Sequence, residues 1–409
     1  MEREELAAWL RLTLTPGIGN GSARKLLAAF GLPHAIFEQP ANALTQVVGS
    51  TQAQAVRQMP AELDALLATT WGWLQQDEPG GIRHQIVALG DIGYPQALLS
   101  LDDPPLMLYL LGTGIFKQNK AVSLIEIRHD AIKKVPIIRV IDPLSSLAVV
   151  GSRNPTPQGA ANARLFAKAV AHAGLTVVSG LALGIDGAAH EGALEGTPAN
   201  SISGATVAVV GTGLDRVYPK AHRDLAHRIA ANGLLVSEYP LGTPPLTANF
   251  PRRNRLIAGL ANGTLVVEAA LKSGSLITAR LTNEQGKDVF AIPGSIHAAQ
   301  SRGCHALIKQ GAKLVESAQD ILEELKWPLS LSSTKAASAN TEDSDSAAGI
   351  FATHALLLTA LGFDPVGLDA LQARCGLDTS EMQAQLMGLE LDGVVARLPG
   401  GLFQRLAQP

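Results

Sequence analysis

Four short segments rich in glycines and hydroxyls, two of them with a cation, each follow an apolar run of the chain. The segments are residues 151–159, 179–186, 211–215 and 272–279. A helical pattern follows each of them, so free backbone N–H groups and the positive end of a helix dipole meet at these turns. Such turns bind anions, and the chemistry that they indicate is the binding of several successive phosphates or of one nucleotide.

A second group of residues that could bind a ligand is the segment Asn249, Phe250, Pro251, Arg252, Arg253, Asn254 and Arg255. Arginine pairs with phosphate oxygens, and an aromatic face stacks on any base without reading its sequence. The same pattern is equally typical of a solvated helix start with Phe250 in the core. The residues by themselves leave both interpretations open.

Several enzyme classes lack their signatures here. Neither a P-loop nor a dinucleotide-binding glycine fingerprint follows any apolar run, which disfavours a P-loop ATPase and an NAD enzyme. Asp186 and His190, four residues apart, are more typical of polar side chains that cap and flank the start of a helix than of a metal site or an acid–base pair. His297, Cys304 and His305 lack zinc spacing. We therefore expect no catalytic residue, no metal and no cofactor.

The elements that must position these residues follow from the apolar runs. Runs at 147–150, 175–178, 207–210, 234–236, 265–267 and 289–292 alternate with helical segments. Continuous apolar strands are buried on both faces, which predicts a parallel sheet covered by helices. The fold class is therefore α/β, with an extended Rossmann-like doubly wound sheet over residues 146–326. Ligands of such sheets bind at the carboxyl ends of the strands, where the four polar segments lie.

The remaining chain divides into four parts. Residues 1–100 are predicted to be a small helical domain of the SAM-like or helix–hairpin–helix type, and residues 101–145 a connection that carries an insertion at 113–145. The turn at 16–19, with its two glycines, is more often a plain connection between helices than a contact to a DNA phosphate. Residues 327–349 form a flexible acidic linker, and residues 350–409 a winged-helix domain of three helices and a hairpin.

Composition sets further bounds. The chain has 409 residues, a net charge of −3, two cysteines, and no apolar run long enough for a membrane span or signal peptide. A reduced cytoplasm and no membrane partner are expected. Residues 151–326 carry 17 basic and 13 acidic side chains, whereas residues 350–409 carry 3 arginines and 6 acids. This asymmetry suits a local phosphate pocket in the central domain.

The motifs of the central domain resemble those of the DNA-processing protein A family (DprA, also called Smf). The resemblance lies in Gly151-Ser152-Arg153-Asn154-Pro155-Thr156, Ser179-Gly180-Leu181-Ala182 with Gly184-Ile185-Asp186, Gly211-Thr212-Gly213-Leu214-Asp215 with Tyr218-Pro219, Phe250-Pro251 with Arg253-Asn254-Arg255, and Ser273-Gly274-Ser275. They occur in order over some 150 residues, and the flanking domains fit the family's longer members.

The resemblance implies a single-stranded DNA-binding recombination mediator of natural transformation. Such a protein protects incoming single-stranded DNA, recruits RecA, helps to load it over single-strand-binding protein, is a homodimer, and is not an enzyme. It also turns the anion-binding edge into a DNA site. The expected DNA-binding residues are Gly151, Ser152, Arg153, Ser179, Gly180, Gly184, Phe250, Arg252, Arg253, Asn254, Arg255, Lys272, Ser273, Gly274 and Ser275.

Three departures from the family pattern stand out. The stretch 113–145 and the segment 197–205 are longer than expected, and both are predicted to be loops, with one edge strand as an alternative within the first. Leu246, Thr247 and Ala248 are neutral where relatives often carry a basic residue before the phenylalanine, and Arg252 is a candidate to compensate.

Two other functions compete with this interpretation. A nucleotide-processing hydrolase on a related Rossmann scaffold would use Glu268 as its acid, but the glycine-rich opening of that class is absent. A DNA-compacting structural protein is disfavoured by the near-neutral charge. The acidic winged helix is predicted to contact protein, because its net charge would repel a phosphate backbone.

Overall fold

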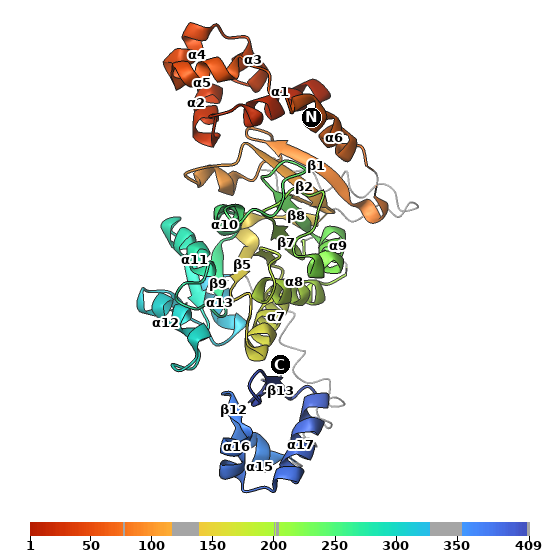
Figure 1. The fold of residues 1–409 in the computed structure, drawn as a ribbon, viewed down its shortest axis with the longest axis vertical. Coiled ribbons are helices and arrows are strands. Elements are labelled where there is room, and N and C mark those ends of the chain that lie inside the picture. Colours follow the sequence, from red (N-terminus) through yellow and green to blue (C-terminus); the bar gives the residue numbers. More distant parts are fainter. Residues whose placement is uncertain (77, 117–138, 200, 202–203, 328–353, 407–409) are drawn as a thin grey trace.

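The computed structural model describes residues 1–76, 78–116, 139–199, 201, 204–327 and 354–406 (Figure 1). Residues 1–76 fold into the helices α1 (Arg3–Leu14), α2 (Asn20–Phe30), α3 (Pro33–Phe37), α4 (Ala41–Val48), α5 (Ser50–Val56) and α6 (Leu63–Leu74). Gly17 makes the turn between α1 and α2 with φ +76°, a conformation that favours glycine. Leu6, Trp9 and Leu26 are fully buried where these helices meet.

A nine-stranded sheet forms the centre of the molecule. Its strands stand in the order β1-β2-β8-β7-β6-β5-β9-β10-β11. The parallel part consists of β5 (Ser146–Val150), β6 (Thr176–Ser179), β7 (Thr206–Val209), β8 (Leu234–Ser237), β9 (Gly263–Val266), β10 (Asp288–Ala291) and β11 (Lys313–Leu314). Every residue of β5 to β9 is buried. The continuous apolar runs thus mark a sheet covered on both faces, as predicted.

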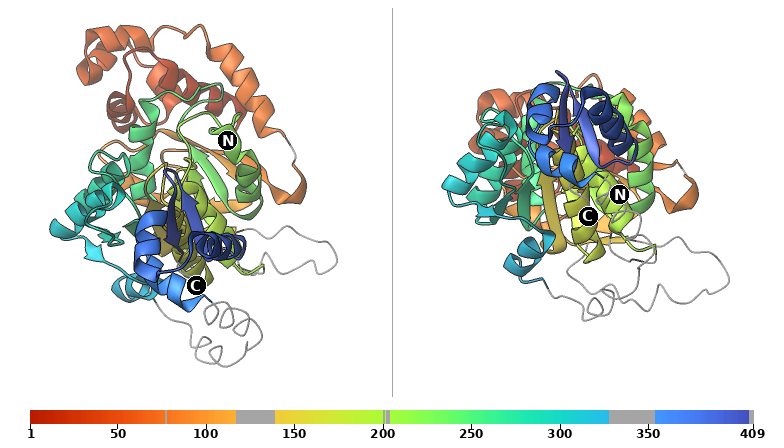
Figure 2. Two further views of the ribbon diagram at one scale, coloured as in Figure 1. Left: turned by 60° about the horizontal axis from the view of Figure 1, so that its bottom comes forward. Right: turned by 90° about the horizontal axis from the view of Figure 1, so that it is seen from below.

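Helices cover both faces of this sheet (Figure 1; Figure 2). On one face α7 (Pro157–His172), α8 (Ile185–Gly196) and α13 (Ala318–Glu324) surround Val149, Ile185 and Phe290, with α9 (Arg223–Asn232) beside them. On the other face α10 (Asn249–Gly259), α11 (Ser275–Glu284) and α12 (Arg302–Lys309) pack on Val150 and Val209. The doubly wound α/β fold is confirmed.

The sheet extends beyond residues 146–326. The strands β1 (Arg83–Ala88) and β2 (Met107–Gly112) pair with each other, and β2 joins β8; both pairings are antiparallel. The short helix η2 (Gln96–Ser100) lies between them. Residues 83–88 were predicted to belong to the helical domain, but they form an edge strand, in which half-buried and buried side chains alternate. One hydrophobic cluster joins the helical unit, β1, β2 and α9.

The insertion predicted at 113–145 falls largely on residues 117–138, which lie outside the described residues. Its described ends are not loops: β3 (Gly114–Phe116) and β4 (Arg139–Ile141) form a parallel two-stranded sheet. The described residues of 197–205 contain neither helix nor strand. The prediction of loops was therefore wrong for the ends of the first segment, where Phe116 and Ile141 are buried and two strands pair.

Residues 354–406 form a winged helix, as predicted. It consists of α15 (Ala355–Leu361), β12 (Val366–Gly367), α16 (Leu368–Cys375), α17 (Thr379–Leu391) and the hairpin β13 (Val395–Leu398) and β14 (Leu402–Arg405). The domain has a hydrophobic core of its own around Leu358, Leu371, Leu386 and Phe403.

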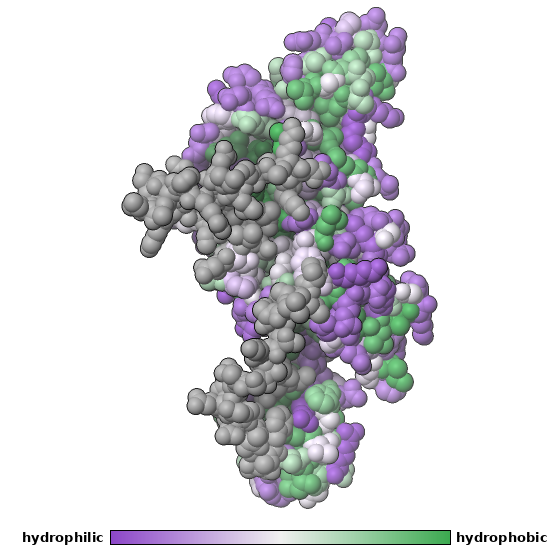
Figure 3. Space-filling model, turned by 180° about the vertical axis from the view of Figure 1, so that it is seen from behind, coloured by the Kyte–Doolittle hydropathy of each residue, from purple (hydrophilic) through white to green (hydrophobic). Residues whose placement is uncertain are grey.

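The surface seen in Figure 3 mixes hydrophilic and hydrophobic residues, and apolar residues gather over the N-terminal helical unit at the top. No helix in the described part of the chain is long and apolar enough to span a membrane.

Candidate nucleic-acid interface

An open groove lies where the strand order changes direction. The chain runs from β5 outward to β6, β7 and β8, and then returns to add β9 on the other side of β5. Ligands of doubly wound sheets bind at this switch point, beyond the carboxyl ends of the strands. The groove there is lined by Gly151, Ser152, Arg153, Gly180, Ala182, Tyr218, Phe250, Arg253, Asn254, Lys272, Ser273, Gly274 and Ser275. We call it the switch-point groove.

Two glycines bring the first turn against the start of α8. A Cβ on Gly151 would lie 2.7 Å from Ile185 Cγ1, and one on Gly184 would lie 2.4 Å from the carbonyl oxygen of Ser152. Gly184 also has φ +81°, which favours glycine. The Ile185 amide donates a hydrogen bond to the Ser152 carbonyl at 3.1 Å. The turn is thus fixed, and Arg153 extends from it into solvent.

Arg153 and Lys272 supply the exposed positive charge of the groove. Both residues are exposed, and neither side chain forms an ion pair with any described residue. The Arg153 guanidinium carbon lies 5.6 Å from the centre of the Phe250 ring, which is cation–π distance. Because no carboxylate of the described residues forms an ion pair with these cations, they are available to an anion.

An aromatic pair lies beside these cations. The Phe250 and Tyr218 ring centres are 5.7 Å apart with 33° between the ring planes, and Tyr218 is 49% exposed. Phe250 is half-buried and lines the groove, which settles the alternative of a core phenylalanine in favour of a groove residue. Tyr218 was missing from the predicted site. Its place in the motif that ends Tyr218-Pro219 was the available signal.

The hydroxyl residues at the start of α11 complete the groove. Ser273 Oγ and Ser275 Oγ share a hydrogen bond of 2.7 Å, and Asn254 donates to the Gly274 carbonyl at 3.2 Å. This contact ties α10 to the N-terminal end of α11. The groove therefore joins segments from both sides of the switch point.

Arg253 lies under the groove instead of in its opening. The side chain is buried, and its guanidinium donates to the carbonyls of Gly180, at 2.7 Å, and Val209. A Cβ on residue 180 would lie 2.3 Å from Arg253 Nη1, so Gly180 makes room for the guanidinium. Burial raises the pKa of the neighbouring Asp186, and the charge of Arg253 partly offsets that rise. Arg253 thus holds the ends of β6 and β7 together.

Ser179 does not line the groove. Its hydroxyl is fully buried and donates to the Val149 carbonyl at 2.6 Å, which links β6 to β5. The sequence places Ser179 at the right strand end, but the side chain at that position points into the sheet.

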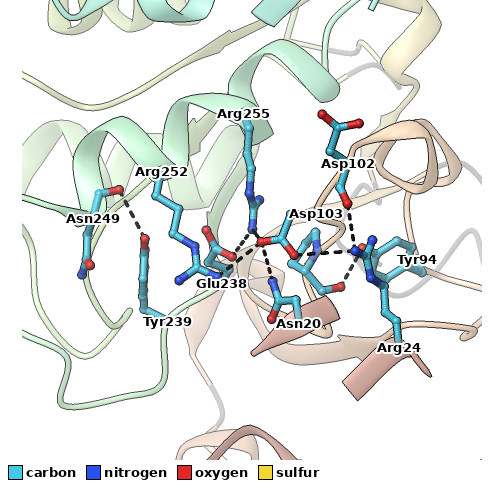
Figure 4. A network of polar contacts seen from close by, with 11 residues as sticks. Asn20, Arg24, Tyr94, Asp102, Asp103, Glu238, Tyr239, Asn249, Arg252 and Arg255 are labelled. Atoms are coloured by element: carbon cyan, nitrogen blue, oxygen red, sulfur yellow. Dashed lines mark hydrogen bonds and ion pairs between the residues drawn. The ribbon is translucent and has the colours of Figure 1, made fainter. Parts of the chain in front are cut away.

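Arg252 and Arg255 extend away from the groove toward the N-terminal unit, where they meet Asp103 (Figure 4). Their guanidinium nitrogens lie 3.4 and 3.7 Å from Asp103 Oδ2, and Arg255 also pairs with Glu238. From the other side Asn20 donates to the same carboxylate at 3.1 Å, and Arg24 donates to the Asp102 carbonyl at 2.8 Å. The two arginines therefore join α10 to α2. Burial raises the pKa of Glu238, and the charge of Arg255 opposes this.

The residues with a conceivable catalytic role are engaged in structure. Glu268 accepts hydrogen bonds from the Thr156 amide at 2.9 Å and the Thr156 hydroxyl at 2.6 Å, at the N-terminus of α7. His190 is buried against Thr206, with 2.7 Å between Nδ1 and Oγ1, and burial lowers its pKa to about 3. In the described part of the chain no three His, Cys, Asp or Glu side chains are grouped to hold a metal ion.

The arginines of the winged helix lie against groups of their own domain. Arg374 donates to the Ala360 carbonyl at 3.3 Å, and the guanidinium carbon of Arg405 lies 4.9 Å from the Phe363 ring centre. Arg397 lies over Phe403 at 5.7 Å. All three arginines of residues 350–409 thus contact their own domain.

These features define an extended Rossmann-like protein with an anion-binding groove at its switch point, flanked by a helical unit and a winged helix. Residues 137–326 match the family model of DNA recombination-mediator protein A, and residues 336–401 match that of the DprA winged helix domain. Protein Smf of Synechocystis is 30% identical over 432 aligned residues, which cover 99% of this chain and all of that protein. The chain belongs to the DprA/Smf family.

Two further relatives support this assignment. Protein Smf of Escherichia coli is 46% identical over 257 residues, which are 62% of this chain and 66% of that protein. The crystal structure of DNA processing protein A from Streptococcus pneumoniae superimposes with a TM-score of 0.59 and 34% identity, covering 79% of this chain and 98% of that one.

Proposed function

We propose that this chain binds single-stranded DNA in the switch-point groove and acts as a DNA recombination mediator. The observation that carries the proposal is that Arg153 and Lys272, two cations without an ion-pair partner among the described residues, line the same groove as the Phe250 and Tyr218 rings. Cations that follow a backbone, together with aromatic faces for bases, are the two parts of a single-strand site. Family membership points the same way.

The aromatic pair favours a single strand over a duplex. In a duplex the bases are stacked inside the helix, so their faces cannot reach Phe250. An unpaired base can stack there while its phosphates meet Arg153, Lys272 and the backbone amides of the 151–153 and 273–275 turns. In this arrangement Arg253 and Gly180 shape the groove from below, and Arg252 and Arg255 hold α10 in place.

The finer proposal follows the family. In the bacterial cytoplasm, a homodimer of this chain would protect incoming single-stranded DNA during natural transformation and help to load RecA over single-strand-binding protein. The protein would perform no catalysis on the strand. The engagement of Glu268 with Thr156 supports this, because the acid that a nucleotide hydrolase would need is occupied at the start of α7. Purine monophosphates incubated with the protein should release no free base.

The direct test is a binding series with labelled single- and double-stranded oligonucleotides. We expect Arg153→Ala to weaken all single-stranded sequences about equally, by roughly 5-fold at 0.1 M salt, and to lower the salt slope by about 0.7. Arg280→Ala is the matched control, because Arg280 is an exposed cation of α11 outside the groove. Equal affinity of Arg153→Ala and the native protein, or a loss for one sequence only, would contradict the proposal.

A further inference from the structure

A second groove adjoins the switch-point groove along α9. It is formed by α9, the end of α6, β1 and the loop after β7, and we call it the α9 groove. Its floor is apolar: Trp73, Leu181, Leu214 and Leu235 line it and are each less than 9% exposed. Its opening carries Lys220 and Arg223, from the short helix η4 (Lys220–His222) and the first turn of α9.

The two grooves meet at the loop after β7. Val210 lines both of them, and Leu181 of the α9 groove lies between Gly180 and Ala182 of the switch-point groove. Tyr218 and Pro219 border the first groove, and the next residue, Lys220, borders the second. A bound polymer that runs from Phe250 across Tyr218 therefore meets Lys220 first when it enters the α9 groove.

The boundary between the grooves is held in a fixed shape. Leu181 has φ +68°, an unusual conformation for a leucine, and its carbonyl oxygen lies 3.0 Å from His222 Nδ1. The His222 ring packs so closely on α8 that a Cβ on Gly187 would lie 2.7 Å from its Cε1. These contacts fix η4 beside the turn after β6, and they direct Lys220 and Arg223 to the groove opening.

The charges of the α9 groove favour an anion. Lys220 and Arg223 are exposed and make no ion pair with any described residue. Among its described lining residues the two acids are engaged: Asp215 pairs with Arg216 at 2.8 Å, and Glu78 Oε1 lies 2.9 Å from His84 Nε2. The other ring nitrogen of the buried His84, Nδ1, has no hydrogen-bond partner among the described residues. The floor thus suits a base and the opening suits phosphates.

We propose that the α9 groove binds the continuation of the same single strand, so that the DNA path runs from Phe250 over Tyr218 to Lys220 and Arg223. This inference rests on the proposed function of the switch-point groove. Charge complementarity and the continuity of the two grooves, which share Val210 and adjoin at Pro219 and Lys220, select a DNA strand as the occupant. Short strands occupy the first groove alone, and longer strands occupy both.

The test measures affinity against strand length. Labelled oligo(dT) from roughly 4 to roughly 20 nucleotides spans the site sizes of single-strand binders. For Lys220→Ala/Arg223→Ala in the full chain, we expect native affinity for the shortest bound strand. For the longest we expect a loss on the order of 10-fold, and a salt slope lower by about 1.4, as two lost phosphate contacts require.

The control variant Lys168→Ala/Lys309→Ala removes the same charge from exposed residues outside both grooves and should follow the native protein at every length. Thermal melting of both double variants checks that they fold. If short strands bind but the Lys220/Arg223 variant keeps the native gain with length, the inference is overturned while the proposed function stands. If native protein binds no single strand at any length, the proposed function itself is overturned.

Discussion

The cations of the switch-point groove differ sharply from the arginines of α10. Arg153 and Lys272, far apart in the sequence, lie on one groove and form no ion pair with any described residue. Arg252, Arg253 and Arg255, adjacent in the sequence, are divided between the Asp103 junction and the buried strand ends. A cluster of cations in a sequence is therefore not a cluster in space. The arginines of α10 support the groove, and the exposed charge comes from two separate turns.

Helix geometry explains the division. Successive residues of an α-helix point about 100° apart, whereas residues three apart share a face. Arg252 and Arg255 accordingly point together toward Asp103 (Figure 4), and Arg253 points across the helix into the sheet. The contrast predicts that loss of an α10 arginine destabilises the fold, while loss of a groove cation weakens only binding. Four predictions, from the largest expected effect to the smallest, can break or sharpen it.

Arg253→Ala should be the most damaging change. It leaves the carbonyls of Gly180 and Val209 without their donor and removes the cation nearest Asp186, so we expect a loss of about 3 kcal/mol of unfolding free energy. Urea unfolding measures it. Arg252→Ala is the control, because that side chain is half exposed and its pairing with Asp103 is worth less than about 1 kcal/mol. Equal stability of the two variants would break the comparison.

Arg255→Ala should cost about 2 kcal/mol, because it leaves the buried Glu238 without its cation. The additional change Glu238→Gln should restore part of the loss, since it removes the uncompensated carboxylate. A double-mutant cycle measured by urea unfolding gives the coupling. Strictly additive effects of the two changes would show that the pair contributes no net interaction.

A smaller effect, over the range from pH 7 to pH 5, concerns the protonation of His190. Burial lowers the pKa of His190 from 6.5 to about 3, so between these values the unfolded chain binds a proton that the folded chain does not. Stability is therefore full above pH 6.5 and falls as the pH drops toward 3, by at most about 1.4 kcal/mol per pH unit. The carboxyls of Asp186, Glu238 and Glu268, with raised pKa, act in the opposite direction.

The His190 contribution is isolated by comparing unfolding of the native protein and His190→Gln at pH 7, 6 and 5. The variant should show the shallower decline on acidification. Parallel curves would rule out the buried neutral imidazole as the source.

The smallest expected effect is that of removing residues 350–409. Three arginines against six acids give residues 350–409 a net charge of −3, which leaves little to attract a phosphate. Single-strand affinity of the shortened chain should stay within about 10-fold of the native value. A larger loss would extend the DNA site to the winged helix.

Much of the fold could be predicted from local pattern. Buried parallel strands require continuous apolar runs, and those runs located β5 to β10. The strand β1 was missed because an alternating edge strand beside a helical unit carries a weak signal, and the pairing that makes it a strand comes from β2, about twenty residues later. Of the predicted DNA-binding residues, all but Ser179, Gly184, Arg252 and Arg255 line the groove.

The sequence by itself determined which residues stand at the carboxyl ends of the strands, because a strand end and a following helix start are local features. It could not determine the direction of each side chain there. Partners distant in the sequence decide whether Ser179 faces the groove or the sheet. Partners up to 149 residues away also decide whether an arginine meets a phosphate, a carbonyl or Asp103. Tertiary packing brings those partners together, and it therefore decided which cations remain free for a ligand.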